Sequence, residues 1–393
     1  MKTPILSALL VFAAVSANAQ YTYQDATNKD MLRPALRNSV KARKEIVIPQ
    51  VDGYNVYKAD LHTHSIYSDA QTTPEWRVTE AWYDGLDIIA MTDHIEYRPS
   101  EPKMLEFLKE YAEKNAKAEN YDIVFQQKGN DGIKADLNLS VRLAQAATQN
   151  MPILVIPGTE ITRPYKDVGH FNALFTTDNN LIPSDDPMQA LRNAKAQGAL
   201  VQYNHPGWKR TSLDMTEFEI NAYKEHLVDG IEVMNGPEFY PKAIDRAKEQ
   251  GLFISANTDI HMTTGTDYKG AQVGRNMTLI LAKDKTLESV REALEAHRTL
   301  AYAFDQICGD EELLKALFNA SVKCTHIGVD YKGRSIFSVT NMSSVPYIIS
   351  SNGGNPQWVE PFTTVQFKVA DPVMTVLNMW CGENSHPQIP VKF

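Results

Sequence analysis

The chain has 393 residues, of which 43% are hydrophobic, and its formal net charge is −9 at pH 7. The hydrophobic content is ample for a packed core, and the length is that of roughly two or three domains. The acidic balance argues against a general nucleic-acid surface, because phosphate backbones bind to cationic faces. We therefore expect no nucleic-acid partner.

Residues 1–19 have the pattern of a secretory signal peptide. Lys2 precedes the apolar run I-L-S-A-L-L-V-F-A-A-V, and A-N-A stands before Gln20. This pattern predicts cleavage after Ala19 and a periplasmic or secreted protein. A membrane anchor is the alternative, but the run is shorter than the ~20 residues that a spanning helix needs. Because no other stretch is long and apolar enough, we expect no stable membrane insertion.

Residues 20–55 are polar and irregular, and we expect them to form an N-terminal arm. Strand-like and helical patterns alternate after this arm. Two of the helical patterns, at 74–85 and 187–198, begin with proline and end at glycine, as helices commonly do. A further strand at 277–282 and a helix at 285–297 end this part of the chain. The seven strands predicted before them are 57–62, 86–92, 153–158, 170–176, 199–204, 230–234 and 252–257.

The last part of the chain, residues 308–393, has a different pattern. Its alternating runs, such as I-F-S-V-T at 336–340, predict a small antiparallel β domain without a chemical site. The three cysteines, Cys308, Cys324 and Cys381, all lie here. The sequence leaves open whether two of them form a disulfide.

The middle of the chain holds nine histidine and carboxylate residues of the types that bind zinc, manganese and iron. Six of the ten histidines belong to this set. Several members lie in short clusters: D-L-H-T-H at 60–64, T-D-H at 92–94 and T-D-I-H at 258–261. We predict a hydrolytic centre with two or three divalent ions, held by His62, His64, Asp69, His94, Glu160, His170, His205, Asp259 and His261.

Most of these residues come directly after a strand-like run. On a strand, residues i and i+2 face the same side, so His62 and His64 should point together, as should Asp259 and His261. His170 differs, because it stands at the start of its strand. Ligands gathered at one end of many parallel strands are typical of an α/β barrel.

The blocks D-L-H-T-H-S-I-Y-S-D-A, M-T-D-H, P-G-T-E-I, Y-N-H-P and N-T-D-I-H, in this order, resemble the polymerase and histidinol phosphatase (PHP) superfamily of metal-dependent phosphoesterases. The resemblance covers residues 56–305. It implies a distorted (β/α)7 barrel, related to the TIM barrel, and a centre of up to three metal ions. Two features depart from the family pattern. Ala70 follows Ser68-Asp69 where glycine is common, and the segment between the second and third blocks is longer.

The longer segment has a charged and mostly helical pattern over residues 98–133. We expect it to be an insertion above the barrel mouth that forms a lid.

The resemblance also implies how the ligands are shared. A first ion would be held by His62, His64, Glu160 and Asp259. A second would be bridged by Glu160 and held by His170 and His205. A third would be held by Asp69, His94 and His261. The candidates for a direct catalytic role are Glu160, Asp259 and His205.

Two further carboxylates stand next to the ligand candidates. Asp60 is in phase with His62 on one strand, and Asp93 precedes His94. A buried carboxylate needs a partner, so we expect each of them to orient a ligand histidine. The cations near the ligands that are candidates to bind substrate phosphate are Arg163, Lys209, Arg210 and Arg275.

Clustered divalent ions lower the pKa of bound water toward ~7, and paired ions can clamp the attacking and leaving oxygens in phosphate ester hydrolysis. The sequence has no G-x-S-x-G motif, catalytic cysteine or P-loop. We therefore predict an enzyme, a PHP-type phosphoesterase that uses a metal-bound hydroxide on a small phosphorylated substrate, most simply a phosphomonoester. Two alternatives stay open: a hydrolase of a lactone or amide on the same centre, and a metal-binding barrel without catalysis.

Overall fold

The computed structural model describes residues 22–24, 27–34, 42–101, 125–129, 132–268, 274–351, 353–369 and 373–390. The chain divides into two units, residues 1–42 and residues 43–393. In the first unit, β1 (Thr22–Gln24) pairs antiparallel with β2 (Leu32–Pro34). The predicted signal peptide lies outside the described residues. Among those that are described, no helix has the length and hydropathy needed to cross a membrane.

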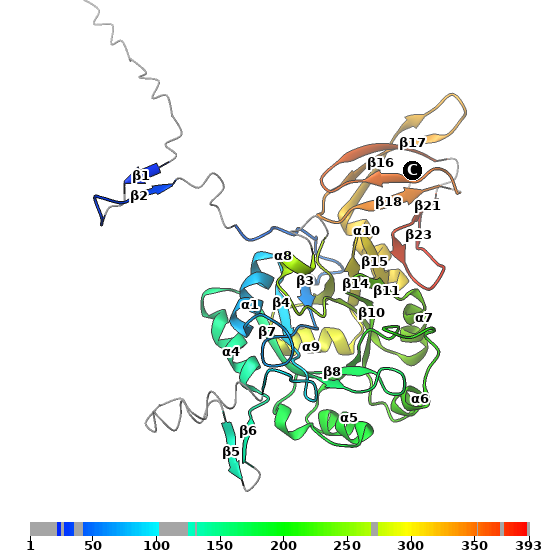
Figure 1. Ribbon diagram of the computed structural model, residues 1–393. Helices are drawn as coiled ribbons and strands as arrows, with labels where there is room; N and C mark the ends of the chain where they lie inside the picture. The colour runs from blue at the N-terminus through cyan, green and yellow to red at the C-terminus, as the bar shows by residue number, and fades with distance from the viewer. Residues whose placement is uncertain are drawn as a thin grey trace, which may run out of the picture. The chain divides into compact units, whose positions relative to one another are not determined.

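The second unit is built on one curled sheet with helices on its outer side (Figure 1). The strand order is β11-β10-β9-β8-β7-β4-β3-β13-β14-β15-β22, with β12 paired to β10. All seven predicted strands are present in it. The members are β3 (Asn55–Asp60), β4 (Ile88–Met91), β7 (Leu154–Thr162), β8 (His170–Leu174), β9 (Leu200–Tyr203), β10 (Gly230–Asn235), β11 (Glu238–Phe239), β12 (Phe253–Asn257), β13 (Met277–Ala282), β14 (Thr299–Ala303), β15 (Gln306–Gly309) and β22 (Met379–Trp380).

The sheet is mixed, although most neighbours in the predicted barrel run parallel. Strands β3, β4 and β7 form parallel pairs, and β10 lies parallel to both β9 and β12. Strand β8 is the exception, because it lies antiparallel to both β7 and β9. Side-chain hydrogen bonds close the curl, with Thr278 Oγ1 accepting from Ala256 N (3.0 Å) and Thr299 Oγ1 accepting from Ile254 N (3.3 Å). The distorted barrel that the sequence predicts is confirmed.

The helices lie mainly between consecutive strands, and their starts follow from the sequence. Pro74 and Pro187 occupy the first turns of α1 and α5, and Thr73 and Asp186 cap these helices through their side chains. The helices are α1 (Pro74–Tyr83), α4 (Leu139–Ala147), α5 (Pro187–Ala196), α6 (Glu217–Lys224), α7 (Pro241–Gln250), α8 (Thr264–Asp267), α9 (Leu287–Glu295) and α10 (Glu311–Ser321).

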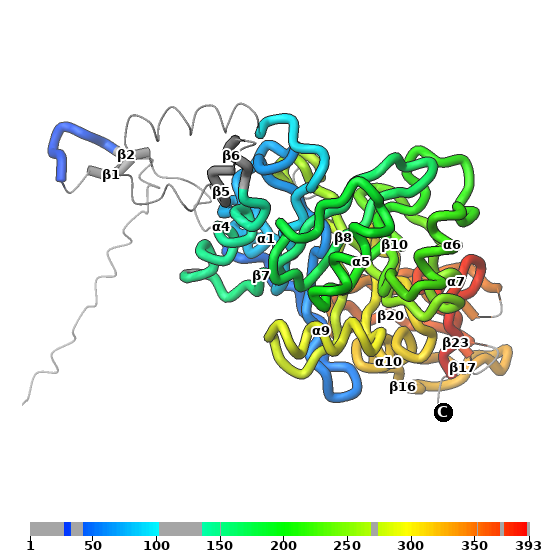
Figure 2. The backbone as a smooth tube through the Cα atoms, turned by 90° about the horizontal axis from the view of Figure 1, so that it is seen from below, coloured from blue at the N-terminus to red at the C-terminus, as the bar shows by residue number. Residues whose placement is uncertain are grey.

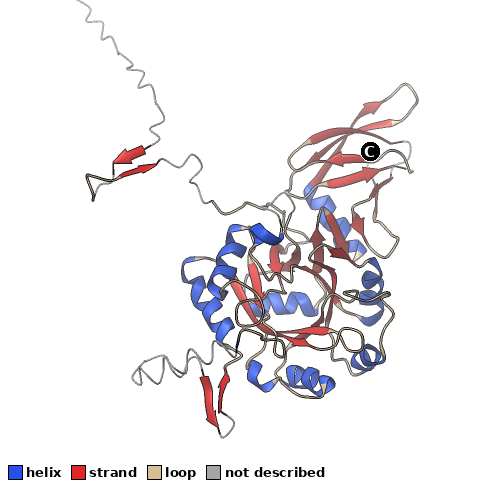
Figure 3. Cartoon of the chain, viewed as in Figure 1, coloured by secondary structure: helices blue, strands red, loops and turns tan. Residues whose placement is uncertain are grey.

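One end of the barrel is covered by helix α9, which is seen behind the ring of strands in Figure 3 and lies at the end of the barrel in Figure 2. Its Val290 and Leu294 pack in one apolar cluster with Ile88, Leu200 and Phe253, which stand near the starts of their strands. The amino-terminal edge of the sheet is therefore a packed core. The carboxyl edge is left to carry polar side chains.

The C-terminal part contains the predicted antiparallel β structure, on one side of the barrel and next to α7 and α10 (Figures 1 and 2). Its two sheets share a core with the barrel, because Phe337 and Ile349 belong to the same apolar cluster as Leu281 and Leu300. Cys308, Cys324 and Cys381 are unpaired. The sheets have the orders β16-β17-β20 and β19-β18-β21-β23, with β16 (Val322–Val329), β17 (Ser335–Asn341), β18 (Tyr347–Ser350), β19 (Gln357–Val359), β20 (Thr364–Val369), β21 (Val373–Val376) and β23 (Gln388–Pro390).

The predicted lid, 98–133, is described only in part, since residues 102–124 lie outside the described range. The helical expectation is wrong for its last residues. There, β5 (Phe125–Gly129) pairs antiparallel with β6 (Gly132–Ala135). The D-G pair at 131–132 is a common hairpin signal.

Candidate metal centre

The structure brings all nine predicted metal ligands together at the carboxyl edge of the sheet. The loops after β3, β4, β9 and β12 supply seven of them, and β7 supplies Glu160. His170 joins them from the first position of β8. Because β8 runs antiparallel to β7, its start lies beside the end of that strand, with His170 opposite Thr162. A residue at a strand start thus reaches the same edge as residues at strand ends.

Glu160 lies between two groups of histidines and is fully buried. Its Oε1 lies 3.4 Å from His62 Nε2, 3.3 Å from His170 Nδ1 and 3.7 Å from His205 Nε2. Its Oε2 lies 3.6 Å from His64 Nε2 and 2.6 Å from His94 Nδ1. Each carboxylate oxygen of Glu160 therefore faces a different group of histidine nitrogens. A carboxylate placed in this way can bridge two metal ions.

Asp259 lies beside His62 and His64. Its Oδ1 lies 3.2 Å from His62 Nε2 and 3.0 Å from His64 Nε2, and these two nitrogens are 3.1 Å apart. The i, i+2 prediction therefore holds for His62 and His64, which continue the extended chain beyond β3. Asp259 itself has a positive φ of 52°, which is an uncommon and costly conformation for a residue other than glycine.

Asp69 lies between the histidines of a further group. Its Oδ1 is 3.4 Å from His94 Nε2 and 3.1 Å from His261 Nε2, and the rings of His94 and His261 each stack on His64. Potential ligand atoms converge within 4.8 Å of one another in this set and in three others, one of which joins Glu160, His170 and His205.

Unsatisfied buried atoms show that this centre fits metal ions. Asp69 Oδ1 and Glu160 Oε2 are buried and accept no hydrogen bond, although histidine nitrogens lie close to both. Unpartnered buried polar atoms are rare and costly in proteins. Residues that coordinate a divalent cation point their nitrogen and oxygen atoms at the ion and not at one another. The arrangement of these atoms is therefore that of metal ligands.

The cluster without metal attracts protons. Burial lowers the pKa of His94, but Glu160 and Asp69 overcome this and raise it to about 10. Burial, His94 and His261 lower the pKa of His64 to about 4. Burial raises the pKa of the Glu160 carboxyl, but the surrounding histidines hold it well below its usual range. Protons on histidines therefore balance the carboxylates until cations replace them.

Metal binding at pH 7 should release protons, because a pKa of about 10 leaves His94 protonated in the metal-free protein and a ligand histidine must be neutral. The apparent affinity should then fall as the pH falls. Calorimetric titration of the metal-free protein with zinc, in two buffers of different ionisation enthalpy, measures this release. His94→Ala should release fewer protons than the wild type. Heats that are independent of the buffer would contradict the prediction.

Glu232 is a site residue that the sequence reading missed. It is fully buried on β10, and its Oε1 accepts from His62 Nδ1 (2.9 Å) and Asn257 Nδ2 (2.9 Å). Its Oε2 accepts from the backbone N–H of His205 (2.6 Å). A carboxylate on Nδ1 leaves Nε2 of His62 free to bind metal. The signal was present, since a lone glutamate in the apolar run G-I-E-V-M needs a buried partner.

Asn204 is a second missed residue, although it stands in the quoted block Y-N-H-P. It is buried, and its Nδ2 donates to Glu160 Oε1 at 2.8 Å. This bond fixes the orientation of the carboxylate that lies between the histidine groups.

The predicted partners of Asp60 and Asp93 are wrong. Asp60 Oδ2 accepts from Arg275 Nη2 (2.8 Å) and Thr258 Oγ1 (2.5 Å), and so it anchors the loop that follows β12. Asp93 accepts from Ser65 N, Ser65 Oγ and Ser68 Oγ, each at 2.7 Å. These donors lie on nearby loops and satisfy both carboxylates without a histidine ring.

Three of the four cations predicted to bind phosphate are paired with carboxylates and are not among the residues that line the cavity beside the centre. Arg275 is buried and bridges Asp60 and Asp84. Arg210 pairs with Glu219 at 2.5 Å, and Arg163 pairs with Glu96 at 2.9 Å. Lys209 differs from them, because it lines the cavity beside the centre.

That cavity has a volume of about 550 Å³, in the range of small-molecule sites. Six of the nine predicted ligands line it. Its aromatic lining is Tyr97, Tyr165 and Trp208, which the sequence reading did not single out. The Trp208 ring lies 5.3 Å from the His205 ring and 5.5 Å from the His170 ring. A substrate in this cavity would meet the candidate metal ligands directly.

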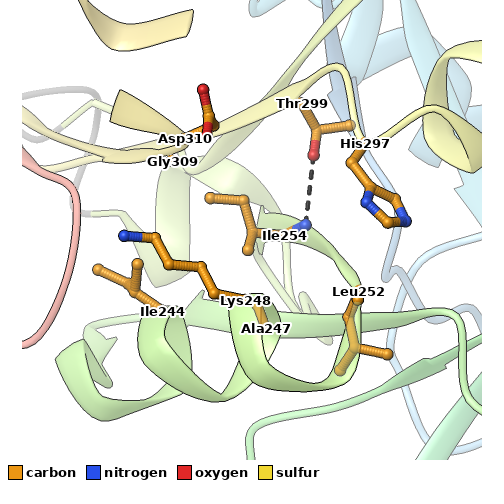
Figure 4. Close-up of a pocket in the computed structure, with 10 residues that line it drawn as sticks. Ile244, Ala247, Lys248, Leu252, Ile254, His297, Thr299, Gly309 and Asp310 are labelled. Atoms are coloured by element: carbon orange, nitrogen blue, oxygen red, sulfur yellow. Dashed lines mark hydrogen bonds between the residues drawn. The ribbon is translucent and has the colours of Figure 1, made fainter. Parts of the chain in front are cut away.

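A smaller cavity of about 240 Å³ lies away from the centre, between α7 and the starts of β12 and β14 (Figure 4). Its charged residues have structural partners. Lys248 donates to the Cys381 carbonyl, and Asp310 caps α10 through the backbone N–H groups of Glu312 and Leu313. The chemistry therefore belongs to the larger cavity.

The model of the PHP domain family matches residues 60–328. The chain belongs to the PHP domain family. It is a metal-dependent phosphoesterase by family, and therefore a hydrolase. The comparison with curated proteins found no match.

Solved structures add a two-domain protein from Bacteroides vulgatus that contains a predicted PHP-like metal-dependent phosphoesterase. It is 30% identical, with a TM-score of 0.75, over 91% of this chain and 100% of that one. A candidate metal-dependent phosphoesterase from Bifidobacterium adolescentis is 15% identical, with a TM-score of 0.39, over 61% of this chain and 96% of that one. An amidohydrolase from Chromobacterium violaceum is 16% identical, with a TM-score of 0.36, over 53% and 89%.

Proposed function

We propose that this PHP domain is a phosphomonoesterase with two or three divalent ions, of zinc, manganese or iron, at its centre. The observation that carries the proposal is the position of Glu160 between separate groups of histidines, with His62, His170 and His205 around one oxygen. Nine ligand candidates are too many for a single tetrahedral ion. The similarity to the Bacteroides vulgatus protein, whose name includes a PHP-like phosphoesterase, supports the same reaction class.

Charge favours a monoester over neutral substrates. Three divalent ions would bring more positive charge than Asp69, Glu160, Asp259 and the underlying Glu232 can balance, so the centre would stay cationic in an acidic chain. A local cationic focus in a cleft selects a dianionic group over a neutral lactone or amide. A phosphodiester, with one negative charge, should be the weaker substrate.

The bound ions would supply an activated water and positive charge for the phosphoryl oxygens. The chain's own groups position this chemistry. Asn204 and Glu232 hold Glu160 and His62 in place. His205 Nε2 and Asp259 Oδ2 lie 3.8 Å apart and both line the cavity, so they are placed to hold an ion where a reacting water can reach it. The substrate would be a small phosphorylated molecule, and the pattern of residues 1–19 supports export to the periplasm or medium.

Phosphate release from a panel of esters tests this function. The purified protein, loaded with zinc, manganese or iron, should hydrolyse some members of a panel of sugar phosphates, nucleotides and amino-alcohol phosphates. Among chromogenic probes, p-nitrophenyl phosphate should exceed the bis-ester in kcat/KM by at least about tenfold, because the monoester carries the extra charge. Turnover of lactones or amides, without phosphate release from any monoester, would favour the alternative hydrolase.

A further inference from the structure

The loop after β9 presents one lysine to the cavity from a fixed position. Two turns shape this loop, with the Trp208 N–H donating to the His205 carbonyl (2.9 Å) and the Arg210 N–H donating to the Gly207 carbonyl (3.0 Å). Arg210 ties the end of the loop to Tyr203 (2.9 Å) and to Glu219 (2.5 Å). Residues 205–210 are therefore held at both ends.

Lys209 sits in this loop with a positive φ of 53°, a conformation that is unfavourable for a residue with a Cβ. Its ammonium lies 3.9 Å from the centre of the Trp208 ring and 5.8 Å from that of Tyr165. Aromatic faces attract and orient a cation at such distances. The Trp208 ring in turn contacts the rings of His170 and His205, so the lysine is positioned relative to the metal ligands.

Charge in the cavity singles out the same residue. Among the described residues that line it, Lys209 is the only lysine or arginine, and the other charged groups are candidate metal ligands. Ions at the centre would engage the transferred phosphoryl group. The ammonium of Lys209, which lies over the Trp208 ring on an exposed part of the loop, would then face the organic part of the substrate.

We propose that Lys209, held on the Trp208 and Tyr165 rings, binds a second anionic group of the substrate. The preferred substrates are then small phosphate monoesters that also carry a carboxylate. A lysine ammonium is a compact point charge of one unit, which a single carboxylate balances, whereas a second phosphate monoester would bring about two negative charges. This inference rests on the proposed monoesterase function, and it adds the substrate class.

Matched pairs of compounds test it in turnover and in binding. The turnover pair is 3-phosphoglycerate and glycerol 3-phosphate, which differ by the carboxylate. The binding pair, 3-phosphonopropionate and propylphosphonate, cannot be hydrolysed and is titrated calorimetrically into the metal-loaded protein. Lys209→Met keeps most of the side-chain length and removes the charge. Lys166→Met is the control, because its ammonium also lies near the Tyr165 ring (5.9 Å) but does not line the cavity.

The wild type should prefer the carboxylated member of each pair. Lys209→Met should lower kcat/KM for 3-phosphoglycerate, mainly through KM, and weaken 3-phosphonopropionate binding, both by about 10- to 100-fold, the loss expected for a charged hydrogen bond. The effect on the uncarboxylated members should be no more than about threefold. Trp208→Phe should give an intermediate loss on the carboxylated members, since a smaller ring remains, and Lys166→Met should behave as wild type.

Equal losses on both members of a pair would overturn the proposal, because Lys209 would then contact the phosphoryl group itself. An unchanged kcat/KM and an unchanged affinity for both members of a pair in Lys209→Met would also overturn it. If neither ester is hydrolysed but the binding preference and its loss in Lys209→Met are observed, anion recognition by Lys209 stands. The proposed function would then be tested separately by the wider ester panel.

Discussion

Replacing Glu160 by glutamine should lower kcat by at least ~10³-fold and remove about one metal ion per chain, because a metal ion contributes several kcal/mol of transition-state charge stabilisation. The side-chain volume is almost unchanged, but an NH₂ group replaces one of the two carboxylate oxygens. An NH₂ group has no lone pair to offer a metal ion. His94→Ala should cost less, roughly 10- to 100-fold, because His94 belongs with Asp69 and His261 at the edge of the cluster. Activity assays and elemental analysis of proteins purified without chelators measure both effects.

Glu96→Gln is a suitable control for this comparison. Glu96 lies at the same edge of the sheet, but it accepts from the Thr162 N–H and pairs with Arg163 rather than with a ligand histidine. It should retain wild-type metal content and nearly full activity. The wild type should contain two or three ions. One ion or none at full loading would contradict a multinuclear centre, and similar losses in Glu160→Gln and His94→Ala would contradict the bridging role.

Glu232→Gln should weaken metal binding by about 10- to 100-fold, as losses of partners behind metal-bound histidines do. It should also lower the free energy of unfolding by about 1–3 kcal/mol. Both oxygens of this buried carboxylate accept hydrogen bonds, and the amide NH₂ group that replaces one of them cannot accept. The donors include His62 Nδ1 and Asn257 Nδ2 on one oxygen and the His205 N–H on the other.

A spectroscopic measurement separates positioning from a general loss of stability. The ¹⁵N chemical shifts of the His62 ring report which nitrogen carries the proton, and Glu232→Gln should shift this tautomer balance. Glu225→Gln is a control of the same chemistry, since Glu225 pairs with Arg192 on the surface. Unchanged zinc affinity and an unchanged His62 tautomer in Glu232→Gln would show that Glu232 only fills space.

The sequence by itself was sufficient to predict the seven strands of the barrel and the nine candidate ligands that meet at their edge. His62 and His64 illustrate the reason, because an i, i+2 spacing on extended chain places two side chains on one face whatever the rest of the fold does. The run before them predicts a strand, which the structure places at Asn55–Asp60. Proline at the starts of α1 and α5 placed those helices in the same local way.

Pairings between distant residues were decided only by the tertiary structure. Asp60 and Arg275 are 215 positions apart and Glu232 and His62 are 170 apart, so no local pattern shows that they meet. Arginines near the ligands in sequence proved to be neutralised by Asp84, Glu219 and Glu96. The position of His170 at the centre also depends on the antiparallel direction of β8. Local spacing fixes which way a side chain faces, whereas its partner depends on which strands become neighbours.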